Sequence, residues 1–101
     1  MNLTVVTEDK KKQWWEWHKE NPHVYDMFER FALEAYNTGR DNFSHWLIMN
    51  RIRWETAIVT TGDDFKIRND FIAYYARLFM VYNPQCRGFF RTKKMKEETE
   101  E

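Results

Sequence analysis

The chain has 101 residues, of which 43% are hydrophobic and 18% aromatic, and its formal net charge is zero. Large rings let a short chain bury a sizeable core, which argues against disorder and predicts a single domain over residues 1–101. One cysteine, Cys86, excludes an intrachain disulfide, and no apolar run approaches the roughly 20 residues that cross a bilayer. We therefore expect a cytoplasmic chain that does not contact membranes.

A first helix is predicted over about residues 8–19. Its start, TED (7–9), combines a capping side chain with acidic groups that suit the positive N-terminal end of a helix. Asn21-Pro22 ends this helix and opens the next one, because proline fits the first helical turn. The residues before the helix, LTVV (3–6), have the composition of a very short strand.

The clearest helical pattern begins at Pro22. At 100° per residue, its apolar side chains fill one continuous arc and its charged side chains fill the other, as in a surface helix with one buried face. Gly39 is a natural stop for this helix. The apolar arc consists of Val24, Tyr25, Met27, Phe28, Phe31, Ala32, Ala35 and Tyr36.

Two more helices are predicted after Gly39. Ser44 or Asn42 caps one that runs to about Thr60, and the turn around Gly62 follows it. The last strong helix spans about residues 70–83. Its expected core stripe consists of Phe71, Tyr75, Leu78 and Tyr82, widened by Ile72, Tyr74, Phe79 and Val81.

These patterns predict a mainly α fold, a small bundle of three to four helices with at most one or two very short strands. GFFRT (88–92) is the best strand candidate, and residues 1–7 and 94–101 are expected to be flexible ends. The order of two helices, a basic helix and then GFFRTKK is similar to that of a winged-helix domain. A wing needs two strands, and only one candidate follows the last helix.

Arg51 and Glu55 lie one turn apart within the predicted third helix. A helical wheel places them between two apolar stripes, whereas Arg53 falls on the wetter face. Two interpretations follow from this placement. The two side chains form a buried ion pair that fixes helix packing, or they line a pocket and meet a ligand or partner.

Residues 51–95 carry nine Lys or Arg and four Asp or Glu, a net charge of +5, and such a basic segment can attract phosphate. The outer face of the last helix joins an arginine to small residues, as a DNA-reading helix requires. An ordinary solvent-exposed face is the alternative. The candidate nucleic-acid-binding residues are Lys66, Arg68, Asn69, Ala73, Arg77, Arg91, Lys93 and Lys94.

Three tryptophans within WWEW (14–17) cannot all face one side of a helix. At least one of Trp14, Trp15 and Trp17 should therefore lie near the surface, and exposed tryptophan is enriched in binding hot spots. These residues are candidates for contact with a protein partner, and the alternative is that their rings cap the small core.

The sequence offers no recognisable catalytic constellation, no Gly-rich phosphate loop and no metal-ligand spacing, so we predict no metal site and no cofactor. Cys86 lies between Gln85 and Arg87 without an adjacent histidine, so we interpret it as an incidental cysteine rather than a nucleophile. Enzymatic activity is left open but ranks below the binding functions.

Three blocks together resemble a family of small uncharacterised proteins encoded in bacteriophage genomes, prophages and bacteria. They are NPHVYDMFERFALEA (21–35), FSHWLIMNRIRWET (43–56) and TTGDDFKIRNDFIAYYARLFMVYNPQCRGFFRT (61–92), and they cover about two thirds of the chain. The order RIRWET, GDDFKI, YYARLFM and GFFRT is specific in combination. The resemblance implies a phage-type setting and brings no established activity.

The leading hypothesis is a small DNA-binding accessory or regulatory protein of phage type, with duplex DNA as its partner. The alternative is a protein-binding module, such as a phage inhibitor of a host or defence protein. A binder of small, nucleotide-like molecules ranks third. Formation of a homodimer is left open.

Overall fold

The helices form where the apolar periodicity predicts them. The computed structural model describes residues 3–59 and 66–92, and within these ranges the chain forms four α-helices. They are α1 (Leu3–Glu20), α2 (Pro22–Tyr36), α3 (His45–Val59) and α4 (Ile72–Tyr82), with 3₁₀ turns at Asn69–Phe71 and Pro84–Cys86. The prediction of a mainly α bundle is confirmed.

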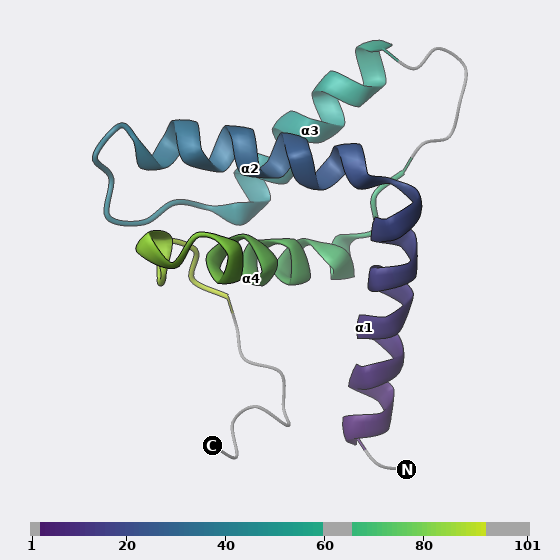
Figure 1. Cartoon of the computed structure of the whole chain (residues 1–101). Helices are drawn as coiled ribbons and strands as arrows, with labels where there is room; N and C mark the ends of the chain where they lie inside the picture. Colours follow the sequence, from purple (N-terminus) through teal and green to yellow (C-terminus); the bar gives the residue numbers. More distant parts are fainter. Residues whose placement is uncertain (1–2, 60–65, 93–101) are drawn as a thin grey trace.

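The helices α2 and α4 lie one over the other, and the other two pack around them (Figure 1). The chain turns sharply after α1, which stands across the ends where α2 and α4 begin. Helix α3 crosses α2 and then runs away from the rest of the bundle. None of the helices within the described ranges is long and apolar enough to cross a membrane.

Local hydrogen bonds fix the ends of the helices. Asn21 donates from its side-chain amide to a backbone carbonyl in the last turn of α1, at 2.9 Å, and Pro22 then begins α2. Ser44 accepts a hydrogen bond at its Oγ from the backbone N–H of Leu47, at 3.3 Å. Ser44 is therefore a cap of α3, as the sequence suggested. Gly39 follows α2 with φ of +89°, a conformation that favours glycine.

The start of the chain differs from the prediction. LTVV belongs to α1, which begins at Leu3 rather than near residue 8, so these residues form no strand. Strand propensity is a weak signal that a neighbouring helix can override. The other predicted flexible end, 94–101, lies outside the described residues.

The predicted strand in GFFRT is reduced to one pair of residues. Phe43 and Phe90 form an isolated parallel β-bridge, and the Phe43 N–H donates to the carbonyl oxygen of Phe89 at 2.9 Å. Within residues 3–59 and 66–92 there is no β-hairpin, so the structure lends the winged-helix order no support.

Aromatic rings dominate the core. Tyr75 of α4 is fully buried, and its ring lies 5.5 Å from that of Trp14 on α1 and 6.1 Å from that of Phe28 on α2. Phe79, one turn further along α4, lies 5.6 Å from Phe90. The largest fully buried side chains are Tyr75, Phe28, Phe79, Met49, Ile52, Ile72, Val24 and Cys86.

The buried residues of α4 differ from those of its predicted core stripe. Ala76, outside that stripe, has no exposed surface, whereas Val81 and Tyr82, expected in the core, are 71% and 56% exposed. The first two turns of α4 place most of their side chains in the core, whereas its last turn leaves Val81 and Tyr82 at the surface.

The predicted buried ion pair between Arg51 and Glu55 is wrong. Arg51 is exposed, and its Nη1 lies 3.4 Å from Oε1 of Glu34 on α2. Its guanidinium lies 4.1 Å from the centre of the Phe31 ring. Glu55 is half-buried, and no charged side chain in the described part of the chain is buried.

Arg53, expected on the wet face, is the more enclosed arginine. Its Nη2 donates to the carbonyl oxygen of Ile67 at 2.6 Å and to Oδ1 of Asn69 at 2.7 Å. These bonds tie α3 to the residues that lead into α4. One of the two apolar stripes on the wheel contains Leu47 and Trp54, which are exposed, whereas the buried residues in the described part of α3 are Ile48, Met49 and Ile52.

We therefore expect Arg53→Ala to destabilise the fold more than Arg51→Ala. Loss of two hydrogen bonds to a charged, half-buried group should lower the free energy of unfolding by about 1.5–3 kcal/mol. Loss of the exposed pair with Glu34 should cost less than about 1 kcal/mol. Chemical denaturation of both variants measures the difference, and an equal or larger loss for Arg51→Ala would contradict it.

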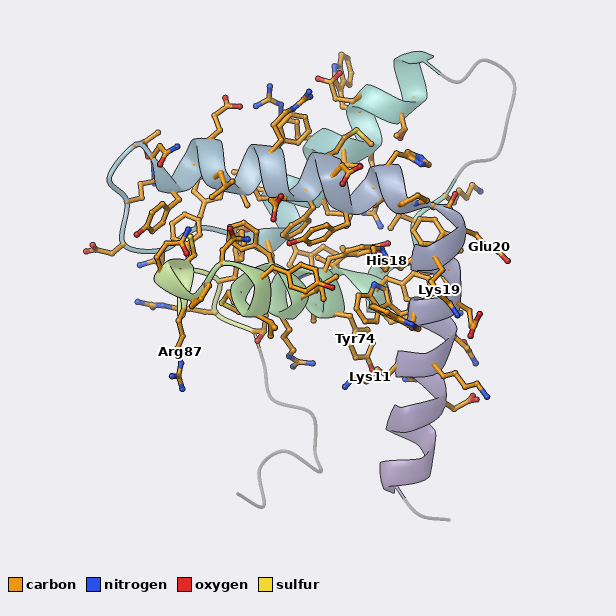
Figure 2. All side chains as sticks on the ribbon, viewed as in Figure 1. Lys11, His18, Lys19, Glu20, Tyr74 and Arg87 are labelled. Carbon is orange, nitrogen blue, oxygen red and sulfur yellow. The ribbon has the colours of Figure 1, made fainter. Side chains whose placement is uncertain are left out.

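His18 lies with Tyr74 in the angle between α1 and α4 (Figure 2). Its ring centre is 5.8 Å from those of Trp14 and Tyr75, and its Nδ1 is buried. Burial lowers the pKa of His18, and the charge of Asp26 acts in the opposite direction. Burial also lowers the pKa of His45, with the charge of Arg77 as the second cause.

These shifts predict that acid destabilises the chain before its carboxylates titrate. A base whose pKa is lowered by folding binds fewer protons in the folded chain than in the unfolded chain. The free energy of unfolding is then at its full value above the unfolded pKa of 6.5 and falls as the pH drops through that value. Denaturation between about pH 7 and pH 5 should show this decline, and His18→Phe should reduce its slope. An unchanged slope in His18→Phe would show that this histidine is not responsible.

Candidate functional site

Helix α3 exposes large apolar side chains on the side away from the core. Trp46 is 46% exposed, Leu47 55% and Trp54 67%, and the exposed Asn50 lies between the two tryptophans. We call these four residues the α3 outer face. Residues 46, 50 and 54 lie on successive turns, so their side chains follow one line along the helix. Because they adjoin one another, they form a patch rather than singly scattered hydrophobic residues.

A hollow adjoins this face where α3 packs against α2. We call it the α2–α3 groove, and its volume is about 510 Å³. Aromatic and aliphatic side chains form most of its walls, and polar groups lie among them. The lining residues are Phe31, Glu34, Ala35, Thr38, Arg40, Phe43, Leu47, Ile48, Asn50 and Arg51.

Two arginines of the groove lie against its aromatic walls. Arg51 lies 4.1 Å from the centre of the Phe31 ring, and Arg40 lies 5.5 Å from that of Phe43. Cation–π contacts hold a guanidinium in place while its remaining N–H groups stay available to an acceptor. Arg51 already contacts the Glu34 carboxylate. The groove can thus accept an apolar group and place a hydrogen-bond acceptor near a guanidinium.

The pocket interpretation therefore applies to Arg51 but not to Glu55. Arg51 lines the α2–α3 groove together with Glu34, whereas the half-buried Glu55 is not among the lining residues. The sequence pattern identified one functional candidate in α3 and assigned it the wrong partner.

The tryptophans of α1 divide between core and surface. Trp14 is 4% exposed and stacks on Tyr74 at 5.4 Å, so it cannot contact a partner without unfolding, and its assignment to a partner site is wrong. Trp17 is half-buried and lies 5.7 Å from Phe71. Trp15 is 40% exposed, which confirms that at least one of the three rings reaches the surface.

Two of the candidate DNA-contacting residues are engaged within the chain. Arg68 holds the Asp70 carboxylate with contacts of 2.6 and 3.0 Å and also donates to Gln13 of α1 at 2.9 Å. Asn69 accepts the hydrogen bond from Arg53. A phosphate or base edge would have to replace these contacts before it could use either side chain.

The other candidates are spread over several segments. Lys66 and Arg91 are exposed at the two ends of the 66–92 range. Ala73 and Arg77 are half-buried on α4, and Arg77 lies 5.9 Å from the Tyr74 ring. The remaining two, Lys93 and Lys94, lie outside the described residues.

Chemistry at sulfur or at a metal gains no support in the described ranges. Cys86 is buried, and burial raises the pKa of its thiol, which disfavours the reactive thiolate. Residues 3–59 and 66–92 contain no group of three or more His, Cys, Asp or Glu side chains that could hold a metal ion.

Sequence reasoning missed Trp46, Leu47 and Trp54 as site residues. A signal was present, because α3 carries large apolar residues around more than one face, and a single buried face cannot accommodate all of them. Which face is buried depends on its neighbours in the fold.

Searches of protein-family descriptions, curated proteins and solved structures find no match to this chain. The resemblance to small phage-type proteins thus stays a prediction. The site has to be interpreted from its own geometry.

Proposed function

We propose that the chain is a protein-interaction module that binds a partner through the α3 outer face and the α2–α3 groove. The observation that carries this proposal is the exposure of Trp46, Leu47 and Trp54 beside a largely apolar hollow. A chain with so many buried rings does not need these residues for its core. Keeping them in water costs hydrophobic free energy that a partner surface would recover.

The composition of the surface supports a protein partner. Tryptophan and arginine are the residues most enriched in interface hot spots, and this surface contains two of each: Trp46, Trp54, Arg40 and Arg51. A groove flanked by exposed apolar residues suits an apolar side chain projecting from a second protein. Inhibition of a host or defence protein is the form of this proposal that a phage-type setting suggests.

Binding to duplex DNA is the weaker alternative. Arg68 and Asn69 already have partners within the chain, and α4 is enclosed along its first two turns. A recognition helix must enter the major groove with its side chains free. The exposed basic residues Lys66 and Arg91 could still contact phosphate, so the experiment below includes DNA.

Binding of a small molecule is favoured by one observation, the volume of the groove. About 510 Å³ falls within the roughly 300–1,000 Å³ of ligand pockets. Such a ligand would leave Trp46 and Trp54 exposed, which is why we rank it below a protein partner.

The proposal predicts that Leu47→Asp abolishes partner capture. Leu47 belongs to both the outer face and the groove, and a carboxylate there would have to be desolvated in the complex. The tagged chain is purified from its native host with and without nuclease, and co-purifying protein is quantified by mass spectrometry. A specific partner should be lost at least about tenfold, the effect of roughly 1.4 kcal/mol in binding.

Val81→Asp provides the matched control, since Val81 is an exposed apolar residue on α4 at 71% exposure. It should retain the partner, and both variants should keep the thermal stability of the parent chain. Capture that is equal in both variants contradicts the proposal. Capture of DNA that nuclease removes, with no protein lost in Leu47→Asp, would favour the DNA alternative.

A further inference from the structure

The two exposed tryptophans of α3 lie symmetrically about Asn50. Trp46 and Trp54 lie four residues before and after Asn50, and all three are exposed. At 100° per residue, the two indoles flank Asn50 by about 40° on either side. An antiparallel copy of the same helix, centred on Asn50, would therefore bring each Trp46 against the other copy's Trp54. This is the self-complementarity that a two-fold interface requires.

The polar residue at the centre fits the same arrangement. The asparagine side chain carries both a donor and an acceptor, so two Asn50 amides that meet on a two-fold axis can bond to each other. A single asparagine within an apolar helix seam is known to fix register and oligomeric state. Ala57, also exposed and only about 20° from the Asn50 direction, leaves room for a second helix to approach.

The helix is accessible for such a contact. Figure 1 shows the C-terminal part of α3 running away from α2 and α4, and Trp46, Asn50 and Trp54 are exposed along the helix, so this side can face a second α3. If a tryptophan side chain offers roughly 250 Å², exposures of 46% and 67% leave roughly 280 Å² of indole surface on each copy. Two copies would bury about twice that area, together with Leu47 and Ala57. This area lies below the roughly 1,200–2,000 Å² of stable specific interfaces and in the range of weak, transient contacts, so it predicts a weak, concentration-dependent dimer.

We infer that the α3 outer face binds a second copy of this chain, with two antiparallel α3 helices related by an axis through Asn50. The inference rests on the proposed function and names the partner of one part of its surface. Asn50 and Leu47 also line the α2–α3 groove, so the dimer contact shares these two side chains with the proposed partner site, whereas Arg40 and Phe31 belong to the groove alone.

The first test is the size of the purified full chain, a 12.6 kDa monomer by sequence, measured over a concentration series by light scattering. We expect a dimer at high concentration that dissociates on dilution. Asn50→Asp, which places like charges on the axis, should shift the chain to monomer, as should Trp54→Ala. Val81→Asp should leave the dimer intact, because Val81 lies on α4.

Variants with one introduced cysteine test whether the two-fold axis passes through Asn50 and whether the two α3 helices are antiparallel. Asn50→Cys should form a disulfide-linked dimer under mild oxidation, on the order of tenfold faster than Lys11→Cys on α1 (Figure 2), because a dimer raises the effective concentration of facing thiols. The natural Cys86 is 1% exposed and does not compete. Ala57→Cys should form no disulfide-linked dimer, since an antiparallel pair separates the two introduced thiols by about 21 Å along the helix axis.

A chain that stays monomeric at every concentration, with no faster cross-linking of Asn50→Cys, would overturn the inference. Fast cross-linking of Ala57→Cys would overturn it too, because it indicates parallel helices. The proposed function fails separately. If the parent chain is monomeric but Leu47→Asp loses a foreign partner, only the dimer is refuted. If the parent chain is dimeric but Leu47→Asp captures the foreign partner as well as the parent does, only the binding of that partner is refuted.

Discussion

The packing of Tyr75 between α1 and α2 is the interaction on which the other parts of the structure depend. Tyr75 belongs to α4, and its ring is fully buried in the core. There it contacts Trp14 and His18 of α1 and Phe28 of α2. Burial raises the pKa of the Tyr75 hydroxyl above its ordinary value, so the group stays uncharged in this apolar setting. Large rings in edge-to-face and stacked contacts hold three helices together with few residues.

This use of aromatic residues determines which helix is left for recognition. Helix α4 buries three of its four rings, α1 adds Trp14, and α2 contributes its apolar arc to the same core. Helix α3 contributes Ile48, Met49 and Ile52 and keeps two indoles in solvent. The proposed partner site therefore lies on the helix whose tryptophans the core leaves exposed.

The sequence predicts those features of the fold that depend on residues within one helix, and it fails for those that depend on neighbouring segments. The pattern of α2 has one apolar and one charged face, so the sequence alone places its start at Pro22, and the predicted apolar arc includes all five of its buried residues. Helix α3 has apolar residues on opposite faces, and only the neighbouring segments determine that Ile52 is inside and Trp54 outside.

The role of Arg53 shows the same limit at a single residue. Its acceptors, Ile67 and Asn69, come 14 and 16 residues later in the chain, and a helical wheel contains no information about them. The groove is likewise formed by two helices, so no single-helix pattern could reveal it. The surplus of apolar residues on α3 was visible, but its position on the surface was not.

The pairing of Phe43 with Phe90 has a consequence for the order of folding. Most helical contacts join residues close in sequence, and such contacts form quickly because little chain entropy is lost. The bridge and its hydrogen bond join segments that are almost half the chain apart, so closing this large loop is entropically costly until α2, α3 and α4 are already packed. We expect Phe43 and Phe90 to contribute little to the transition state. Substitutions there would mainly accelerate unfolding, which makes this contact a determinant of how long the folded chain persists.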